Sequence, residues 1–124
     1  MICLDANIVI ELLLKRRLAQ KCRDYITAVN DDIAITVLSV SIIMYYAEAK
    51  QLDLLAVERF LRDFVWLAVV ETDTTWAFQH FAGKDFEDAL QIATAKREGC
   101  QQFVTLDRAL AKKHIATMPV ELLS

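Results

Sequence analysis

A chain of 124 residues with 56% hydrophobic and 25% charged residues has the size and composition of one folded domain, so we expect a single domain over residues 1–124. The 17 acidic and 14 basic residues give a net charge of −3, which argues against a protein that binds nucleic acid mainly through a positive field. No apolar run reaches the roughly 18 residues of a membrane helix, and the three cysteines are too far apart for a disulfide framework, so we expect a cytoplasmic protein.

Strands and helices are expected to alternate along the chain. Apolar, β-branched runs predict strands at residues 1–4, 33–38, 66–70, 102–106 and 120–123. Apolar residues at helical spacing predict helices at residues 7–14, 18–29, 39–51, 53–64, 74–81 and 85–99. Ser39 or Ser41 and Asp53 are expected to act as N-caps. The alternation predicts a three-layer α/β/α fold with a central, mostly parallel sheet of four to five strands, and no glycine-rich phosphate loop is present.

Acidic residues follow two of the predicted strands and open the helix between them. Asp5 and Asp107 each end a strand, and Asp85, Glu87 and Asp88 begin a helix. In a parallel α/β sheet, strand carboxyl ends and helix N-termini meet at one edge, so we expect these carboxylates to lie together. Clustered carboxylates repel one another unless a cation lies between them, and hard divalent cations prefer oxygen ligands. The pattern therefore favours a metal-dependent phosphoester hydrolase.

Each carboxylate has an alternative role as a helix cap. Asp5 and Asp107 precede helices, and acidic side chains in a first turn stabilise a helix by about 0.3–1 kcal/mol each. Asp85, with Asp88 three residues later, also resembles a capping box with a shortened acid. Capping does not require every cap at one edge to be acidic, so the shared placement favours a functional site.

Three motifs in this order resemble the PIN domains, the fold of the VapC-type toxins of bacterial toxin–antitoxin systems and of related metal-dependent ribonucleases. The motifs are Asp5-x-Asn7 after the first strand, Asp88 opening a late helix, and Thr105-x-Asp107 closing the next strand. The resemblance implies that Asp5, Asp88 and Asp107 bind Mg²⁺ or Mn²⁺, with Asn7 and Thr105 orienting them. It also implies endonucleolytic cleavage of RNA, a small antitoxin as partner, and a homodimer.

The fourth acidic residue of the family has no clear equivalent. PIN domains usually place a glutamate early in the helix after the second strand, and the acid in that helix here is Glu48, about two turns in. Aligning the family's aromatic position with this helix places Ile43 where the acid is expected. Two interpretations stay open: Glu48 is catalytic despite its displacement, or Asp85, one helical turn before Asp88, replaces it.

Basic residues follow the last acidic motif, and we expect Arg108, adjacent to Asp107, to contact a substrate phosphate. Two other functions stay open. One is a PIN-fold protein that has lost catalysis and only binds a partner, which the displaced Glu48 allows. The other is a receiver-type regulatory domain, although Asp5 stands alone where such a domain needs an acidic pair.

The apolar residues exceed what a single core of this size is expected to hold. The mean hydropathy is +0.30, which is high for a monomer of 124 residues. The Leu12-Leu13-Leu14 run and the helices over residues 52–64 carry more apolar positions than one helical stripe. We expect these segments to contact a second copy of the chain or an amphipathic antitoxin helix.

Overall fold

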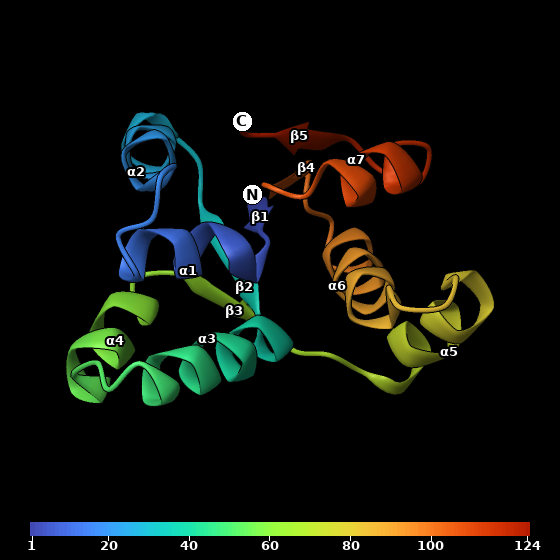
Figure 1. Ribbon diagram of the computed structural model, residues 1–124. Helices are drawn as coiled ribbons and strands as arrows, with labels where there is room; N and C mark the ends of the chain where they lie inside the picture. Colours follow the sequence, from blue (N-terminus) through green and yellow to red (C-terminus); the bar gives the residue numbers. More distant parts are fainter.

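The computed structural model describes residues 1–124, in which strands and helices alternate from one terminus to the other (Figure 1). The strands are β1 (Ile2–Leu4), β2 (Ile33–Thr36), β3 (Val65–Leu67), β4 (Gln102–Thr105) and β5 (Val120–Leu122). The helices are α1 (Ala6–Leu13), α2 (Ala19–Ala28), α3 (Val37–Ala49), α4 (Leu54–Leu61), α5 (Glu71–His80), α6 (Phe86–Arg97) and α7 (Arg108–His114).

The five strands form one sheet in the order β3-β2-β1-β4-β5, and every neighbouring pair is parallel. The chain adds strands outward from β1 through β2 to β3, then crosses to the other side of β1 and adds β4 and β5. The direction of winding therefore reverses between β1 and β4, which is where open α/β sheets bind ligands. The predicted α/β class and parallel sheet are confirmed. The order also differs from the 2-1-3-4-5 order of receiver-type domains, which excludes that alternative.

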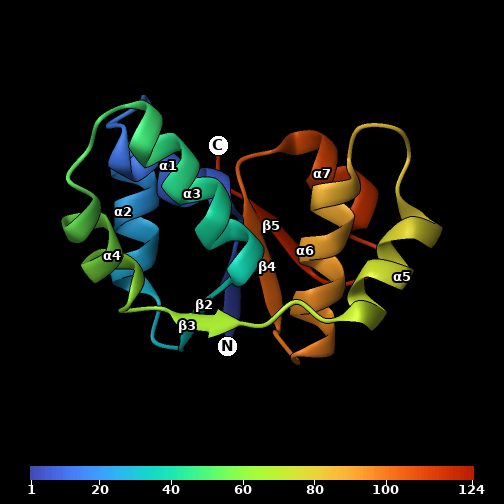
Figure 2. The ribbon, with the colours of Figure 1, turned by 90° about the horizontal axis from the view of Figure 1, so that it is seen from below.

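Helices cover both faces of the sheet (Figures 1 and 2). Helices α1 to α4 lie on one face, and α5 to α7 lie on the other. Alternate residues of each central strand point to opposite faces of the sheet. Leu4 and Val104 pack with the first group of helices, whereas Cys3 and Phe103 pack with the second. All four side chains are fully buried. None of the helices has the length and apolar character that spanning a bilayer requires.

Helix α3 begins earlier than the sequence predicts. Strand β2 ends at Thr36, not at residue 38, and Thr36 rather than Ser39 or Ser41 is the N-cap. The Thr36 hydroxyl accepts a hydrogen bond from the Ser39 backbone N–H at 3.0 Å. Thr36 caps because it is the last extended residue and its hydroxyl reaches the free amides of the first turn. The earlier start leaves the Ser39 hydroxyl free for another contact.

The third strand and the helix after it are also displaced. Strand β3 ends at Leu67, and α5 begins at Glu71 rather than at residue 74. The Asp73 carboxylate accepts the backbone N–H of Val70 at 3.0 Å, and this contact starts the helix one turn earlier. The N-cap predicted for α4, Asp53, is confirmed, since its carboxylate accepts hydrogen bonds from the backbone N–H groups of Leu55 and Ala56.

Candidate active site

The carboxyl ends of β1 and β4 meet the first turn of α6 where the sheet winding reverses. Asp5 follows β1, Asp107 comes two residues after the end of β4, and Asp88 lies in the first turn of α6. The charges of Asp5 and Asp107 both act on Asp88. The structure therefore brings together the three carboxylates that the sequence motifs single out.

Asp5 is buried, with 5% of its surface exposed, although it stands at the N-cap position of α1. Its side chain makes no capping hydrogen bond. Instead, the Thr105 hydroxyl donates to Oδ2 at 2.7 Å, and the Gln91 amide donates to Oδ1 at 3.3 Å. Burial raises the pKa of Asp5 and the charge of Asp107 adds to this, while the Thr105 hydroxyl, the backbone N–H of Asn7 and the Gln91 amide oppose it. Its bonds to Thr105 and Gln91 show that the Asp5 carboxylate is not used only as a helix cap.

The Thr105 hydroxyl joins the two loops that carry Asp5 and Asp107. While it donates to Asp5, its oxygen accepts the side-chain amide of Asn7 at 3.2 Å and the backbone N–H of Asp107 at 2.9 Å. The Asn7 carbonyl oxygen in turn accepts the backbone N–H of Leu106 at 3.2 Å. Asn7 and Thr105 thus lie where the sequence predicts supporting residues, and they hold the loop after β1 against the loop after β4.

Gln91, supported by Ser39, forms a second polar contact to Asp5, and the sequence motifs predict neither residue as part of the site. The Ser39 hydroxyl donates to Gln91 Oε1 at 2.6 Å, and both side chains are almost fully buried. Two signals in the sequence point to them in hindsight. Gln91 comes three residues after Asp88 and therefore shares its side of a helix. Ser39 comes three residues after Thr36, at the N-terminal end of α3.

Asp88 is half-buried and accepts no hydrogen bond from the rest of the chain. Burial and the negative charges of Asp5, Asp107, Asp85 and Glu87 raise its pKa from 3.8 to about 7. Asp85 stands at the N-cap position of α6 but makes no capping hydrogen bond, so the predicted capping box is absent. Asp88 is therefore a carboxylate that the fold places among other negative charges without a compensating partner.

Asp107 does cap a helix, as its alternative role predicts. Its Oδ1 accepts the backbone N–H groups of Ala109 and Leu110 at 2.9 and 3.1 Å. Its other oxygen, Oδ2, accepts no hydrogen bond. Capping and a role in the site are compatible, because the cap uses one oxygen and fixes the direction of the other.

A cavity of about 310 Å³ lies beside Asp88 and Asp107, and Asp85 and Lys113 also line it. Asp85 is ion-paired with Lys113 and accepts the backbone N–H of Ala82 at 2.6 Å. The hydrogen bond from Lys113 is the main reason that the pKa of Asp85 lies below its usual value. Asp85 thus reaches the cavity, but as the partner of a lysine rather than as a free carboxylate.

The structure places the other two predicted residues differently. Arg108 is the exposed first residue of α7, directly after Asp107, and forms no ion pair with the chain. Glu48 is exposed in the last turn of α3, about 16 Å along the helix from its first residue at the sheet edge. Ile43 is fully buried in the core between these two ends. Helix α3 therefore contributes Ser39, and no carboxylate, to the site.

No three carboxylate, imidazole or thiolate groups lie close enough to one point to coordinate a metal ion. The donor set nevertheless fits a hard divalent cation, because it consists of carboxylate oxygens. Asp88 and Oδ2 of Asp107 have no other partner. Burial first, and the neighbouring carboxylates second, raise the pKa of Asp88, and a bound cation would favour its ionised form. Hydrogen bonds hold the Asp5 and Asp107 carboxylates, whereas the Asp88 carboxylate is held by none.

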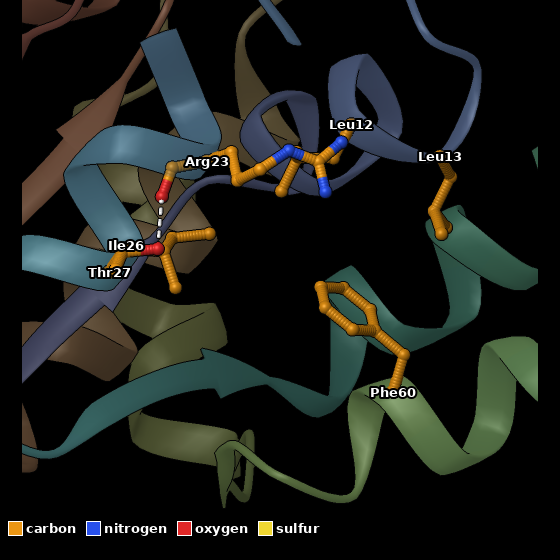
Figure 3. A pocket seen from close by; sticks show the side chains of 6 residues that line it. All are labelled: Leu12, Leu13, Arg23, Ile26, Thr27 and Phe60. Atoms are coloured by element: carbon orange, nitrogen blue, oxygen red, sulfur yellow. Dashed lines mark hydrogen bonds between the residues drawn. The ribbon is translucent and has the colours of Figure 1, made fainter. Parts of the chain in front are cut away.

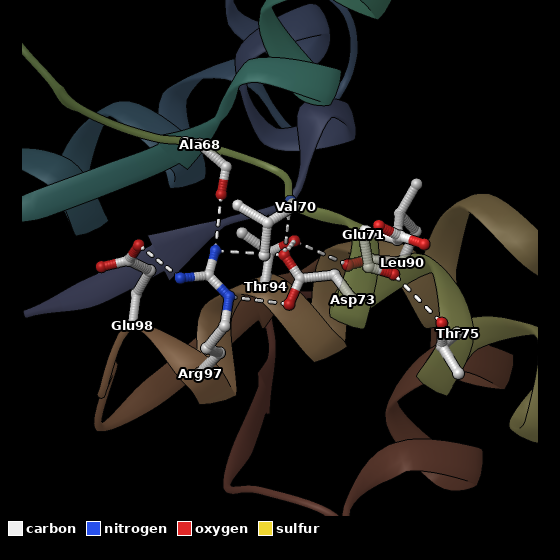
Figure 4. Close-up of polar contacts among 9 residues, drawn as sticks. All are labelled: Ala68, Val70, Glu71, Asp73, Thr75, Leu90, Thr94, Arg97 and Glu98. Atoms are coloured by element: carbon white, nitrogen blue, oxygen red, sulfur yellow. Dashed lines mark hydrogen bonds and ion pairs between the residues drawn. The ribbon is translucent and has the colours of Figure 1, made fainter.

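A separate ionic cluster anchors α6 from the opposite end (Figure 4). Asp73, with 2% of its surface exposed, accepts hydrogen bonds from Arg97 Nε at 2.8 Å and from the Thr94 hydroxyl at 3.0 Å. Arg97 also donates to the carbonyl oxygen of Ala68, just after β3. Burial opposes ionisation of Asp73, but the bonds from Arg97, Val70 and Thr94 outweigh it and lower the pKa. The cluster ties α5 and α6 to the end of β3.

Away from the carboxylates, a cavity of about 370 Å³ opens between α1, α2 and α4 (Figure 3). Leu12, Leu13, Ile26 and Phe60 make its wall apolar, and Arg23 lies at one side. These residues include part of the leucine run and of the 52–64 segment that the sequence marks as excess apolar surface.

Comparisons with known proteins agree with this architecture. The family model of the PIN domain matches residues 2–115. A toxin–antitoxin complex from Klebsiella pneumoniae superposes with a TM-score of 0.77 at 17% identity, covering 97% of this chain and 95% of that one. VapBC2 from Rickettsia felis, bound to a promoter DNA fragment, gives 0.74 at 19% identity and covers 100% of both chains. Mycobacterium tuberculosis VapC20, a Sarcin-Ricin loop cleaving toxin, gives 0.75 at 13% identity, covering 90% and 94%. No curated protein sequence matches.

Proposed function

Because this chain belongs to the PIN-domain family, we propose that it is a divalent-metal-dependent endoribonuclease and the toxin of a toxin–antitoxin pair. One observation carries the proposal: Asp5, Asp88 and Asp107 come from three different elements and meet where the sheet winding reverses, with Asp88 lacking any partner. The likeness to toxin–antitoxin complexes and to a Sarcin-Ricin loop cleaving toxin supports the choice of substrate and partner.

Asp5, Asp88 and Asp107 would hold Mg²⁺ or Mn²⁺. When bound, the ion supplies an activated water and neutralises negative charge on the reacting phosphate. The chain prepares the ligands for it: Thr105 and Gln91 fix Asp5, and the amides of α7 fix Asp107.

Arg108 and Lys113 supply positive charge next to these carboxylates. Arg108 is exposed and free of ion pairs, so its guanidinium is available to a phosphate of the RNA backbone. Lys113 lies on the wall of the acidic cavity, where Asp85 holds its ammonium group. We assign Asp85 the role of orienting this lysine, and we assign Glu48 no role, since it lies at the other end of α3.

The groove between α1, α2 and α4 would receive an amphipathic helix of the antitoxin. Its wall is apolar, and Arg23 at its side suits an acidic residue of such a helix. We also propose a homodimer, because several large apolar side chains remain exposed outside this groove, Tyr45, Leu55 and Phe78 among them.

Single replacements at the three carboxylates test the activity. Asp5→Asn, Asp88→Asn and Asp107→Asn should each reduce Mn²⁺-dependent cleavage of RNA by at least about 100-fold, with circular dichroism unchanged. Glu48→Gln is the matched control, because it removes one carboxylate from the surface and should leave the rate within about twofold. Loss of folding in all three variants would contradict the catalytic assignment. A folded wild-type chain that binds no Mn²⁺ would instead indicate a PIN-fold protein that only binds a partner.

A further inference from the structure

We propose that Gln91 is the positioning residue of the acidic site, and that its neutral amide, held by Ser39, takes the place of a fourth carboxylate. The inference rests on the proposed function and names the residue that completes its site. Gln91 is 2% exposed on α6 and Ser39 is fully buried on α3, and Gln91 joins Ser39 to Asp5 through hydrogen bonds.

The hydrogen bonds determine which way the Gln91 amide faces. Asp5 is an acceptor when ionised, so the amide nitrogen faces it, and Gln91 Nε2 donates to Asp5 Oδ1 at 3.3 Å. The amide oxygen then faces Ser39, whose hydroxyl donates to it at 2.6 Å. Ser39 in turn accepts the hydroxyl proton of Thr36 at 3.2 Å. The chain of donors runs in one direction, from Thr36 through Ser39 and Gln91 to Asp5.

This series of hydrogen bonds links the elements that carry the site. Thr36 ends β2, Ser39 lies in the first turn of α3, and Gln91 lies on α6 one turn after Asp88. Because Gln91 and Asp88 share a side of α6, the bond from Gln91 to Asp5 sets how far Asp88 stands from Asp5. A ligand pair separated by a fixed distance is what a metal site needs from its supporting groups.

A carboxylate could not replace the amide in this position. Glutamate at residue 91 would have no N–H for Asp5 and would place another negative charge within hydrogen-bond distance of it. Helix α3 brings a hydroxyl and no acid to the same place, since Glu48 is at its far end. The site is therefore complete with three carboxylates, one amide and one hydroxyl from α3.

The test compares Gln91→Met, Ser39→Ala and the control Thr94→Val. Gln91→Met keeps the length of the side chain and removes both hydrogen bonds, and Ser39→Ala removes only the hydroxyl that holds Gln91. Thr94→Val removes a buried hydrogen bond to Asp73 one turn further along α6, away from the site. Mn²⁺ affinity is measured by titration calorimetry, and kcat and KM are measured on a short RNA at a temperature where all variants are folded.

We expect Gln91→Met to weaken Mn²⁺ binding by about 10- to 100-fold and to lower kcat, with KM for RNA changed less than about twofold. Ser39→Ala should cause a smaller loss of the same kind, and Thr94→Val should lower the melting temperature while Mn²⁺ affinity stays within about twofold. Wild-type Mn²⁺ affinity and kcat in Ser39→Ala and Gln91→Met would overturn the positioning role. Equal losses in Thr94→Val would also overturn it, since they would reflect a loosened α6. A wild-type chain without Mn²⁺ binding or cleavage would refute the proposed function itself, and the role of Gln91 with it.

Discussion

Replacing Asp88 with asparagine should stabilise the protein at neutral pH when no divalent cation is present. The Asp88 carboxyl has its pKa raised from 3.8 to about 7 by burial and by the charges of Asp5, Asp107, Asp85 and Glu87. At about 1.36 kcal/mol for each pH unit between the folded and unfolded pKa, ionising it costs the folded state at most about 4 kcal/mol. Asp88 is only half-buried, so solvent and side-chain rotation reduce this, and we expect a gain of about 2–3 kcal/mol.

The sign of the pH dependence follows from the raised pKa. Below about pH 4 the carboxyl is protonated in both the folded and the unfolded chain, and Asp88→Asn should match the wild type. Between about pH 4 and 7 the wild type should lose stability relative to the variant, because only its unfolded form ionises freely. Above about pH 7 the difference should be constant.

Urea unfolding of both proteins in EDTA, from pH 4 to pH 8.5, measures this difference. Glu87→Gln is the matched control, because Glu87 is an exposed acid in the same first turn of α6. Its replacement removes the same favourable interaction with the helix dipole as the replacement of Asp88. Its stability should stay within about 1 kcal/mol of the wild type. An Asp88→Asn variant that is less stable than the wild type at pH 8, or whose gain does not depend on pH, would refute the argument that burial and neighbouring carboxylates destabilise the ionised form of Asp88.

The remaining predictions concern the site, the α6 anchor and the apolar surfaces. Asp85→Asn should lower RNA cleavage by about tenfold, because it releases Lys113, whereas Glu48→Gln should not; equal rates in an RNA cleavage assay would contradict the role of Asp85. Asp73→Asn should lower the free energy of unfolding by about 2 kcal/mol at pH 7, less than for a fully buried pair, because Arg97 is one-third exposed. Since the pKa of Asp73 is lowered on folding, this deficit in urea unfolding should be present above about pH 4 and disappear as the pH falls through the folded-state pKa. Sedimentation velocity at micromolar concentration should show a dimer, and a strictly monomeric chain would contradict that proposal.

The order of strands and helices and the three carboxylates were predictable from the sequence because they depend on local patterns. A β-branched run forms a buried strand wherever it lies, and the acids after residues 4 and 106 lie at the carboxyl ends of parallel strands. The boundaries of α3 and α5 were predicted less well. Thr36 and Asp73 decide them, and the sequence offers several hydroxyl and acidic residues nearby that would serve equally as caps.

Asn7 and Thr105 were predicted as supporting residues, but Gln91 with Ser39 and the Arg97–Asp73 pair were not, because their contacts depend on packing between distant elements. Gln91 and Ser39 are 52 residues apart, and Arg97 and Asp73 are 24 residues apart, so only the packing of α3, α5 and α6 on the sheet brings them into contact. Whether Glu48 or Asp85 supplies a fourth free carboxylate depends on where each side chain lies relative to the site and on its ion-pair partners. Spacing in the sequence does not reveal either.

The sequence by itself determined the class of fold, the family and the three carboxylates, because strand and helix periodicity and the motifs at strand ends are local properties of the chain. The tertiary structure alone decided how these carboxylates differ. Asp5 is buried and held by Thr105 and Gln91, Asp107 caps α7 with one oxygen, and Asp88 is left without a partner. The reason is that hydrogen bonds and pKa values depend on which groups lie close together in space. Residues of β1, β4 and α6 come together only when the sheet forms with β1 at its centre.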